Sequence, residues 1–522
     1  MPTYLSPGVY VEEAQSGSRP IEAVGTAVAA FVGFAEKGPF HEPTLVTTWS
    51  QYVQTFGDFV DGSYLGLSVY GYFANGGSVA YVVRVGGASG AGRTGEGEGP
   101  RELTAGEPVG LGSFRVAALP GVDAAGTTVE VSHPEGDNAP EDRFKLVVSQ
   151  DGKTVETHDV STRKNAKNYV VTQVKTGSTR IAVEEAVAQG ALTRPAAQKV
   201  ALLPAAPAPA PATAAVLPAE ISPQEYIGDA AARTGFGGLE AVDEVTMVAV
   251  PDLMAAYEQG LIDAEGVKGV QLAMITHCEL MGDRMAVLDP LPELTPQQVS
   301  RWRQEEAGYD SKYAALYYPW IKAFDPASGK NRLMPPSGHV VGVWSRNDGE
   351  RGVHKAPANE VVRGALDLAV NVTKGEQDLL NPIGVNCIRA FPGRGIRIWG
   401  ARTLSSDAAW RYINVRRLFN YLEESILLGT QWVVFEPNDI RLWGTIRRNI
   451  SAFLREEWRR GALFGASAAE AFYVKCDDET NTPDSIDAGQ VICEIGICPV
   501  KPAEFVVFRL SQFSDSTSLV DE

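Results

Sequence analysis

The sequence predicts a multidomain protein of the α/β and α+β classes, in which a β-rich segment is inserted into a larger fold. Three observations lead to this prediction. The 522-residue chain is too long for a single compact core. Strand-like and helix-like segments alternate after residue 225, which is typical of a mostly parallel sheet with both faces covered. Two low-complexity stretches, 86–110 and 202–220, enclose a segment of short β-like runs.

The composition narrows the class of protein. The chain carries 46 Lys and Arg against 64 Asp and Glu, and the net charge of −18 argues against general nucleic-acid binding. The N-terminus lacks a basic region followed by an apolar one, and no window approaches 18 consecutive apolar residues. We therefore expect neither a signal peptide nor a membrane-spanning helix, and a cytoplasmic location.

The cysteines give no sign of a disulfide framework. Their number is odd, they are thinly spread, and none belongs to a CxxC pair. The predicted state is reduced, mostly buried thiols in a cytoplasm. The five cysteines are Cys278, Cys387, Cys476, Cys493 and Cys498.

Both ends of the chain carry an isolated strand-like run. The alternating residues Val9 to Glu13 follow a turn-like Ser-Pro-Gly, and no second strand follows at hairpin distance. Residues 502–510, "PAEFVVFRL", form a similar run near the C-terminus. Because backbone groups of a strand need hydrogen-bond partners, each run must pair far away in sequence or in another molecule.

The elements between these runs follow from periodicity and capping signals. Thr47 or Thr48 begins the first helix and Gly57 ends it, while Thr295 caps a later helix with Pro296 in its first turn. The predicted strands are 24–34, 79–85, 114–118, 127–131, 144–149, 245–253, 285–291 and 314–324. The predicted helices are 47–59, 64–75, 269–283, 295–308, 411–428 and 439–460, the last two amphipathic.

Signals for chemistry are weak throughout. No HExxH, GxSxG or paired-histidine motif surrounds any of the six histidines. His277 and Cys278 lie in an apolar helix, where a packed core pair is expected. The acidic trio 477–479 has no EF-hand spacing and is interpreted as a solvated loop. We therefore expect no catalytic residue, no cofactor and no metal site.

The segment "FPGRGIRIWGARTL", 391–404, resembles a phosphate-binding loop at first sight. A Walker loop needs Lys followed by Ser or Thr after the glycines, and neither is present. A dinucleotide loop would need glycine at position 398, where isoleucine stands, and a strand follows instead of a helix. We interpret Gly393 and Gly395 as residues of a tight turn into a core strand, with Arg394 and Arg397 in ion pairs within the domain or between subunits.

Several separated motifs, in order, resemble one family. The runs "LNPIGVNCIRAFPGRGIRIWGARTL", "WRYINVRRLFNYLEESI", "FEPNDIRLW" and "PAEFVVF" are similar to the sheath proteins of contractile phage tails and of related pyocin-like and antifeeding-prophage-like injection systems. "YLSPGVYVEE", "TAVAAFVGFAEKGP" and "NGGSVAYVVRV" fit the same family. The likeness covers residues 1–85 and about 225–512.

The resemblance implies a domain organisation. It predicts a subtilisin-like α/β domain without protease activity, a C-terminal α+β sheath core domain completed by exchanged N- and C-terminal strands, and an inserted β-rich outer domain. The expected segments are an N-terminal linker arm (1–22), the first part of the sheath core (23–95), the insert (96–222), the subtilisin-like domain (223–395), the C-terminal sheath core (396–500), and a C-terminal arm and tail (501–522).

The resemblance also implies a function: a structural subunit that polymerises helically around an inner tube and contracts to drive the tube through an envelope. The exchanged strands would be Val9, Tyr10, Val11, Glu12 and Glu13, and Glu504, Phe505, Val506, Val507, Phe508, Arg509 and Leu510. A C-terminal-domain helix lies against the tube in this family, which implicates Arg447, Arg448, Arg455, Arg459 and Arg460.

The expected partners are neighbouring copies, the inner tube protein, and baseplate and cap proteins at the ends, with no nucleic acid and no membrane insertion. Three alternatives remain. The particle could be a phage virion instead of a bacterial injection system. The α/β part could belong to a hydrolase or nucleotide-binding enzyme, which the missing motifs disfavour. A monomeric adhesin is suggested by the β-rich insert.

Overall fold

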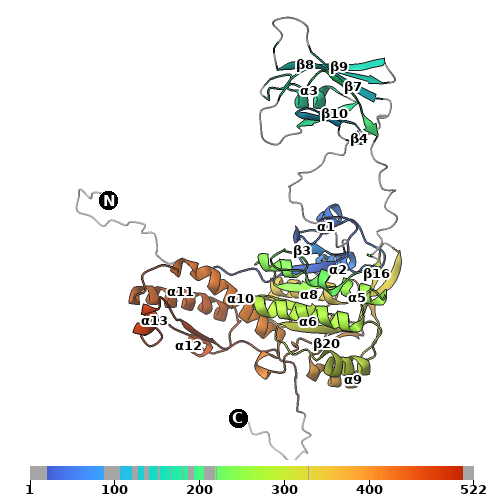
Figure 1. Cartoon of the computed structure of the whole chain (residues 1–522). Helices are drawn as coiled ribbons and strands as arrows, with labels where there is room; N and C mark the ends of the chain where they lie inside the picture. Colours follow the sequence, from blue (N-terminus) through green and yellow to red (C-terminus); the bar gives the residue numbers. More distant parts are fainter. Residues whose placement is uncertain are drawn as a thin grey trace, which may run out of the picture. The chain divides into compact units, whose positions relative to one another are not determined.

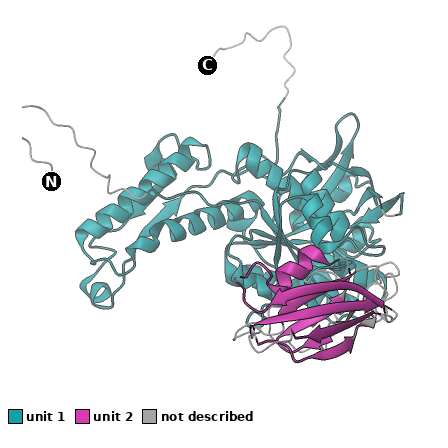
Figure 2. Cartoon of the chain, turned by 90° about the horizontal axis from the view of Figure 1, so that it is seen from above, with its two compact units in different colours: residues 1–89, 214–522 teal, residues 90–213 magenta. Residues whose placement is uncertain are grey.

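The computed structural model describes residues 20–86, 218 and 220–509 except 327, together with most of 106–204. The chain divides into two compact units, residues 1–89 with 214–522, and residues 90–213 (Figure 2). Figure 1 shows the helices and strands of each unit. The first unit holds a large central sheet and a helical C-terminal part, and the second is β-rich.

A nine-stranded sheet is the centre of the first unit. From one edge to the other its strands are β18 (Glu360–Val361), β21 (Gly395–Ile398), β20 (Val385–Phe391), β15 (Ala314–Tyr318), β14 (Met285–Leu288), β13 (Met247–Ala249), β1 (Val28–Gly33), β3 (Val79–Arg84) and β2 (Thr44–Val46). The six strands from β20 to β3 are parallel. The edge strand β2 pairs antiparallel with β3, β21 pairs antiparallel with β20, and the edge strand β18 pairs antiparallel with β21. Every residue of β14 and β15 is buried, as expected for strands covered on both faces.

The sheet joins segments from both sides of the insert. Strands β1, β2 and β3 precede it, and β13 follows it and lies beside β1, with Ala30 opposite Val248. The segments expected at 23–95 and 223–395 therefore contribute to one sheet. Two consecutive parallel strands require a crossover, and the β-rich unit is inserted between β3 and β13.

Helices cover this sheet. They are α1 (Trp49–Phe56), α2 (Leu65–Ala74), α4 (Pro223–Ile227), α5 (Asp252–Glu258), α6 (Ala264–Met281), α7 (Pro296–Arg301), α8 (Ser337–Arg351) and α9 (Lys374–Leu380). Helix α2 packs against α8, while α6 packs against α4 and α5. Thr48 caps α1 by accepting from the backbone N–H of Gln51, and Gly57 ends it with φ 90°, which confirms both predicted ends.

Several predicted strands are shorter than expected, and two of them show why. The run 245–253 gives only β13, because Pro251 starts α5. The run 314–324 is divided by the cis Tyr318–Pro319 bond into β15 and β16 (Ile321–Asp325), and β16 forms a separate sheet with β17 (Lys330–Met334) and β19 (Ala365–Leu368). Apolar runs alone do not show where one strand leaves a sheet.

The C-terminal part has its own core. Helices α10 (Ile413–Thr430) and α11 (Ile440–Arg459) confirm the two predicted amphipathic helices. Residues Trp443, Ile446, Ile450, Phe453 and Leu454 of the predicted α11 stripe are all buried. The remaining elements are α12 (Ala468–Ala471), β22 (Phe472–Lys475), α13 (Pro483–Asp487) and β23 (Glu494–Ile497).

The unit 90–213 has a separate hydrophobic core around Phe114, Leu146 and Val170. Its elements are β4 (Gly106–Glu107), β5 (Val109–Leu111), β6 (Phe114–Ala118), β7 (Thr127–Ser132), β8 (Arg143–Gln150), β9 (Lys153–Ser161), α3 (Val170–Gly177), β10 (Ile181–Glu185), β11 (Gln198–Ala201) and β12 (Leu203–Pro204). The three strands predicted in this segment are confirmed as β6, β7 and β8.

Candidate assembly site

The C-terminal arm, residues 501–509, is fixed to the first unit at one residue. Glu504 accepts two hydrogen bonds from Arg402, at 2.9 Å from Nε and 2.7 Å from Nη2. It also accepts from Asn381 Nδ2 at 2.7 Å and from the Tyr412 hydroxyl at 3.1 Å. Burial opposes ionisation of this carboxyl, yet the hydrogen bonds from Arg402 and Asn381 hold its pKa below the usual value of 4.5.

The arm beyond this anchor exposes an apolar run. Within the described part of the chain, residues 502–509 belong to no strand, although the sequence predicts one at 502–510. The exposed side chains are Phe505 (72%), Val506 (68%), Val507 (77%) and Phe508 (85%). Four adjacent exposed apolar residues form the kind of patch that marks an interaction surface. Leu510 and the predicted N-terminal strand Val9 to Glu13 lie outside the described residues.

A small open sheet lies on the C-terminal core. Strands β22 and β23 pair antiparallel and form a sheet of two strands within the described chain. Phe472 and Val474 of β22 pack on the core under α10 and α11, whereas Tyr473 is 59% exposed. The Tyr473 ring covers Gly496 on the opposite strand, where any Cβ would collide with it. A two-stranded sheet is only marginally stable alone, and both of its edges offer backbone groups.

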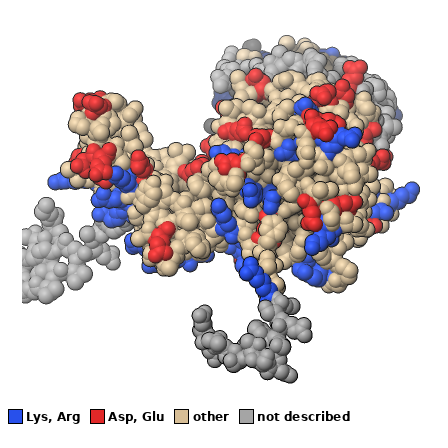
Figure 3. All heavy atoms as spheres, turned by 90° about the horizontal axis from the view of Figure 1, so that it is seen from below, with Lys and Arg blue, Asp and Glu red and all other residues tan. Residues whose placement is uncertain are grey.

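Helix α11 presents a basic face. Arg447, Arg448, Arg455, Arg459 and Arg460 are all exposed, so the predicted residues share one helix and its solvent side. Arg441, which the sequence interpretation omitted, is also exposed and lies on the stripe of Arg448, Arg455 and Arg459, at steps of seven, seven and four residues. Figure 3 shows Lys and Arg side chains grouped on the lobe that contains this helix.

Only some arginines of this face have a carboxylate partner within the described part of the chain. Arg460 pairs with Glu456 and Glu457, and Arg459 approaches Glu456 at 3.9 Å. Arg447 donates to the backbone oxygen of Cys476 at 3.4 Å, and Arg448 donates to Thr445. The contacts of Arg460 with Glu457 and of Arg447 with Cys476 are partly buried, whereas those of Arg448 and Arg459 are exposed and of small energy. The face therefore keeps positive charge available to an acidic partner.

The turn 391–397 is structural. It joins β20 to β21, with Gly393 at φ 71° and Gly395 at φ 76°, conformations that glycine adopts without strain. Arg394 and Arg397 both donate to Asn359, at 2.9 Å and 2.7 Å, and in the described residues they make hydrogen bonds instead of ion pairs. An ion pair from these arginines to another subunit stays a prediction.

A buried ion pair joins the C-terminal core to the central fold. Arg417 of α10 donates to Asp348 of α8 at 2.9 Å and 2.6 Å, and both side chains are at most 4% exposed. Arg417 also donates to the Thr26 backbone oxygen, and the Thr26 hydroxyl donates to Asp348. The contact fixes α10 against the segment that enters β1.

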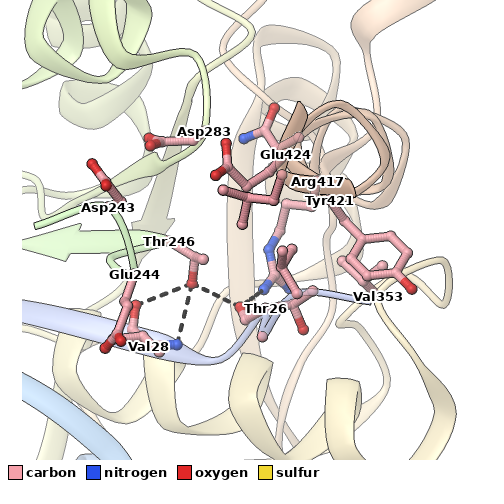
Figure 4. A pocket seen from close by; sticks show the side chains of 14 residues that line it. Thr26, Val28, Asp243, Glu244, Thr246, Asp283, Val353, Arg417, Tyr421 and Glu424 are labelled. Atoms are coloured by element: carbon pink, nitrogen blue, oxygen red, sulfur yellow. Dashed lines mark hydrogen bonds between the residues drawn. The ribbon is translucent and has the colours of Figure 1, made fainter. Parts of the chain in front are cut away.

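A cavity of about 310 Å³ lies beside this ion pair (Figure 4). Carboxyl groups of Asp243, Asp283 and Glu424 line one side, and Tyr421 and Val353 line another. Burial, followed by the nearby Asp283 and Asp243, raises the pKa of Glu424. Within the described residues no group of three or more His, Cys, Asp or Glu is arranged to hold a metal ion.

The remaining candidates for chemistry are core residues. Cys278 is fully buried, and desolvation raises its pKa well above the usual range. Burial and Arg284 lower the pKa of His277 to about 4. A neutral imidazole beside an un-ionised thiol, in the last turns of α6, does not form a nucleophile. In the described part of the chain, no helix combines the length and apolarity needed to cross a membrane.

Two domain descriptions match most of the first unit. The phage tail sheath protein central domain matches residues 221–404, and the phage tail sheath C-terminal domain matches 405–513. The chain belongs to the phage tail sheath protein family. It is 24% identical over 536 residues to the tail sheath protein of Burkholderia phage BcepMu, covering 96% of this chain and 95% of that protein. A prophage major tail sheath protein of Pseudomonas aeruginosa is 26% identical over 294 residues, covering 54% of this chain and 73% of that one.

Solved sheath structures share the fold of this tail sheath protein. The contracted sheath of the extracellular contractile injection system PVC superposes with a TM-score of 0.58, 24% identity, and coverage of 98% of this chain and 99% of that one. The contracted helical sheath of the anti-feeding prophage gives the same score and identity, with coverage of 98% and 100%. The protein is a structural subunit of a contractile sheath, not an enzyme.

Proposed function

We propose that each sheath subunit is linked to its neighbours by exchanged strands, and that the β22–β23 sheet of one copy accepts the arms of others. The observation that carries this proposal is the exposed apolar run 505–508 in a chain that also exposes a two-stranded sheet. Addition of a strand to an open edge satisfies backbone groups on both partners. Arg402 and Glu504 would hold the arm at its root while the part beyond it reaches a second copy.

Burial of the arm's apolar side chains in a neighbouring copy would provide enough free energy to keep two subunits linked. Each large apolar side chain contributes about 1.5–3 kcal/mol when it is fully buried, before the cost of ordering the arm. The arm offers four such residues, Phe505 to Phe508. Subunits joined in this way stay connected while their other surfaces slide, because the arms bend outside the folded units.

Head-to-tail exchange that does not close generates an open helical filament. We propose that the filament surrounds an inner tube and contracts by rigid-body rearrangement of subunits, with the arms as hinges. The subtilisin-like topology expected for 223–395 also stays a prediction, which the doubly covered parallel sheet supports. Baseplate and cap proteins would bind the two ends.

The basic face of α11 is the proposed tube contact. Its six exposed arginines, with Arg441 added, lie on a chain whose net charge is −18, so the face is locally unlike the rest of the molecule. Ion pairs in water are weak and screened by salt, which suits a contact that must hold the tube before contraction and release it afterwards.

We place assembly in the cytoplasm, with release of the particle by lysis. An injection system of the antifeeding-prophage type is the favoured particle, because the solved sheaths of such systems cover 98% of this chain. A phage virion is the alternative, supported by the phage BcepMu relative, which matches at comparable coverage.

Electron microscopy of the protein, alone and with its tube protein, tests this function. We expect striated hollow cylinders in both cases, shorter and wider without the tube. Deletion of residues 505–522 should abolish the cylinders, whereas the control deletion 512–522, which keeps the apolar run, should not. Monodisperse particles from the intact chain under both conditions would refute the polymer, and cylinders from the 505–522 deletion would refute the role of the arm.

A further inference from the structure

Two cysteines face each other at one end of the β22–β23 sheet. The strands pair Lys475 with Glu494, and one further step of the same antiparallel register places Cys476 opposite Cys493. Residues directly opposite in an antiparallel pair have Cα atoms about 4.5–5.5 Å apart. This separation lies within the range of about 4.4–6.8 Å that a disulfide bridges without backbone movement.

The two thiols also interact directly. Burial raises the pKa of each, and the proximity of the Cys476 thiol raises the pKa of Cys493 further. Both are free thiols in this structure; Cys476 is 1% exposed, whereas Cys493 is only partly buried. A small oxidant can therefore reach Cys493, with Cys476 directly behind it.

The surrounding residues hold this end of the sheet in place. Asn481 donates to the Ile492 backbone oxygen at 3.0 Å and accepts from the Ile492 N–H at 2.7 Å, so it closes the loop between the two cysteines. Its Nδ2 lies 3.8 Å from Cys476 Sγ. The pair is consequently pre-positioned and does not depend on a chance encounter of mobile segments.

We propose that Cys476 and Cys493 form an intrachain disulfide when the protein meets an oxidant of the small-molecule disulfide class. Cys493, as its thiolate after loss of one proton, attacks one sulfur of the oxidant, and one small thiolate leaves. Cys476 Sγ, deprotonated in turn, attacks Cys493 Sγ of the mixed disulfide, and the second small thiolate leaves. The cysteine pair loses two electrons and two protons, and the oxidant becomes two thiols.

The environment makes this reaction slow at neutral pH. Burial, followed by the neighbouring Cys476, raises the pKa of Cys493 to about 12, so the reactive thiolate is scarce. The pair should stay reduced in a reducing compartment and oxidise gradually outside it. The initial rate should rise about tenfold for each pH unit between 7 and 9, because the thiolate fraction rises by that factor.

The bond would lock the base of the sheet. It closes the loop from Cys476 to Cys493, whose Cys476 end also contacts Arg447 of α11 through its backbone oxygen. The disulfide itself follows from the register alone. In the polymer, the disulfide would stiffen the β22–β23 sheet, which accepts the arms of other copies, after the particle has left the cell. This consequence rests on the proposed strand exchange.

The test uses the full chain with Cys498→Ser, which removes an exposed thiol that would join separate molecules. Oxidised glutathione is added at pH 7, 8 and 9, free thiols are blocked, and the chain is cleaved by a glutamate-specific protease. No Lys or Arg lies between Cys476 and Lys501, but Glu479 and Glu494 separate the cysteines into different peptides. We expect a Cys476–Cys493 cross-linked peptide and an unfolding midpoint raised by roughly 5 °C, reversed by a reductant.

Two variants keep the result interpretable. Cys476→Ser and Cys493→Ser, each in the Cys498→Ser background, should lose the cross-link, and oxidised glutathione should not raise the unfolding midpoint of either above that variant's own reduced value. A glutathione adduct at Cys493 that never resolves, or full modification with no cross-linked peptide, would overturn the proposal. Because these readouts need no polymer, they are independent of whether the arms exchange.

Discussion

Arg402 and Glu504, 102 positions apart in the chain, form a two-bond ion pair that fixes the root of the C-terminal arm. Their side chains are 10% and 18% exposed, so the pair is largely shielded from solvent. Hydrogen bonds to charged partners in such positions are worth about 1.5–3 kcal/mol. The arm is therefore not a free tail: its first residues belong to the folded unit, and its apolar part starts from a fixed point.

Glu504→Gln should release this root. The amide keeps the shape of the side chain but loses the charge, so we expect a stability loss of about 1–2 kcal/mol and faster hydrogen exchange at residues 503 and 504. The control Lys501→Gln, an exposed position in the same arm, should change neither. Equal exchange in the two variants would contradict the anchoring role.

The same anchor predicts an acid sensitivity. Arg402 and Asn381, acting against burial, hold the pKa of Glu504 below 4.5, so the folded state favours the ionised carboxyl. The stabilisation is present above about pH 4.5 and is lost as the pH falls through the lowered pKa. Protection of the amides of residues 503 and 504 against hydrogen exchange, corrected for the intrinsic exchange rate, should fall in this pH window in the natural chain. In Glu504→Gln it should show no such transition.

Arg417→Met should destabilise the chain far more than removal of a surface pair. It leaves Asp348 buried without its cation, and we expect a loss of about 3–5 kcal/mol in denaturant unfolding. The matched control Arg301→Met breaks an exposed pair with Glu305 and should cost under about 1 kcal/mol. The double variant Asp348→Leu with Arg417→Met should recover most of the loss, and similar costs for the two single variants would contradict the assignment.

Asp289 should make the folded chain less stable as the pH rises, the opposite of the effect of Glu504. Burial raises its pKa to about 7, and its carboxylate accepts from the Ser337 N–H at the start of α8. Because the folded pKa lies above the unfolded value, its stabilisation is complete below about pH 3.8 and is lost as pH rises through about 7. Asp289→Asn should remove this contribution, so the variant gains stability relative to the natural chain from pH 4.5 to 8, by up to a few kcal/mol. The exposed control Asp61→Asn should run parallel to the natural chain.

If the basic face of α11 contacts the tube, reversing its charges should weaken binding to the tube protein. Arg455→Glu with Arg459→Glu should leave the unfolding midpoint nearly unchanged, because both residues are exposed, yet reduce binding to the tube protein by at least tenfold at low salt. Arg301→Glu with Arg351→Glu, exposed on two other helices, is the control with the same change in net charge. The difference between the variants should shrink as salt rises, and equal tube binding by the two would contradict the assignment.

Local signals were sufficient for most elements of the fold. Thr48, Gly57 and Thr295 marked helix ends correctly because capping depends on a few adjacent residues. The amphipathic stripe of α11 gave both its buried face and its exposed arginines, since helical period decides both. The sequence did not predict that β1 and β3 share a sheet with β13, because that pairing spans the insert.

Most features of the assembly site that sequence reasoning missed are long-range; Arg441, on the arginine stripe of α11, is the local exception. Glu504 in an apolar run was the one visible sign of an anchor, but its partner Arg402 lies 102 positions away. Cys476 and Cys493 seemed unrelated because only the strand register places them opposite each other. Arg417 lies in the predicted helix 411–428, but its partner Asp348 is 69 positions away on another helix. Pairings of this kind depend on tertiary structure, not on spacing.

The most direct measurement of the central claim is a photo-cross-link from the arm. A benzoylphenylalanine introduced at Phe508, in copies mixed with isotopically labelled copies, reports which chain the arm touches. In assembled sheath we predict cross-links from an unlabelled arm to residues 472–475 or 494–497 of a labelled copy. Cross-links confined to the arm's own chain, or to surfaces other than β22 and β23, would contradict strand exchange at this sheet.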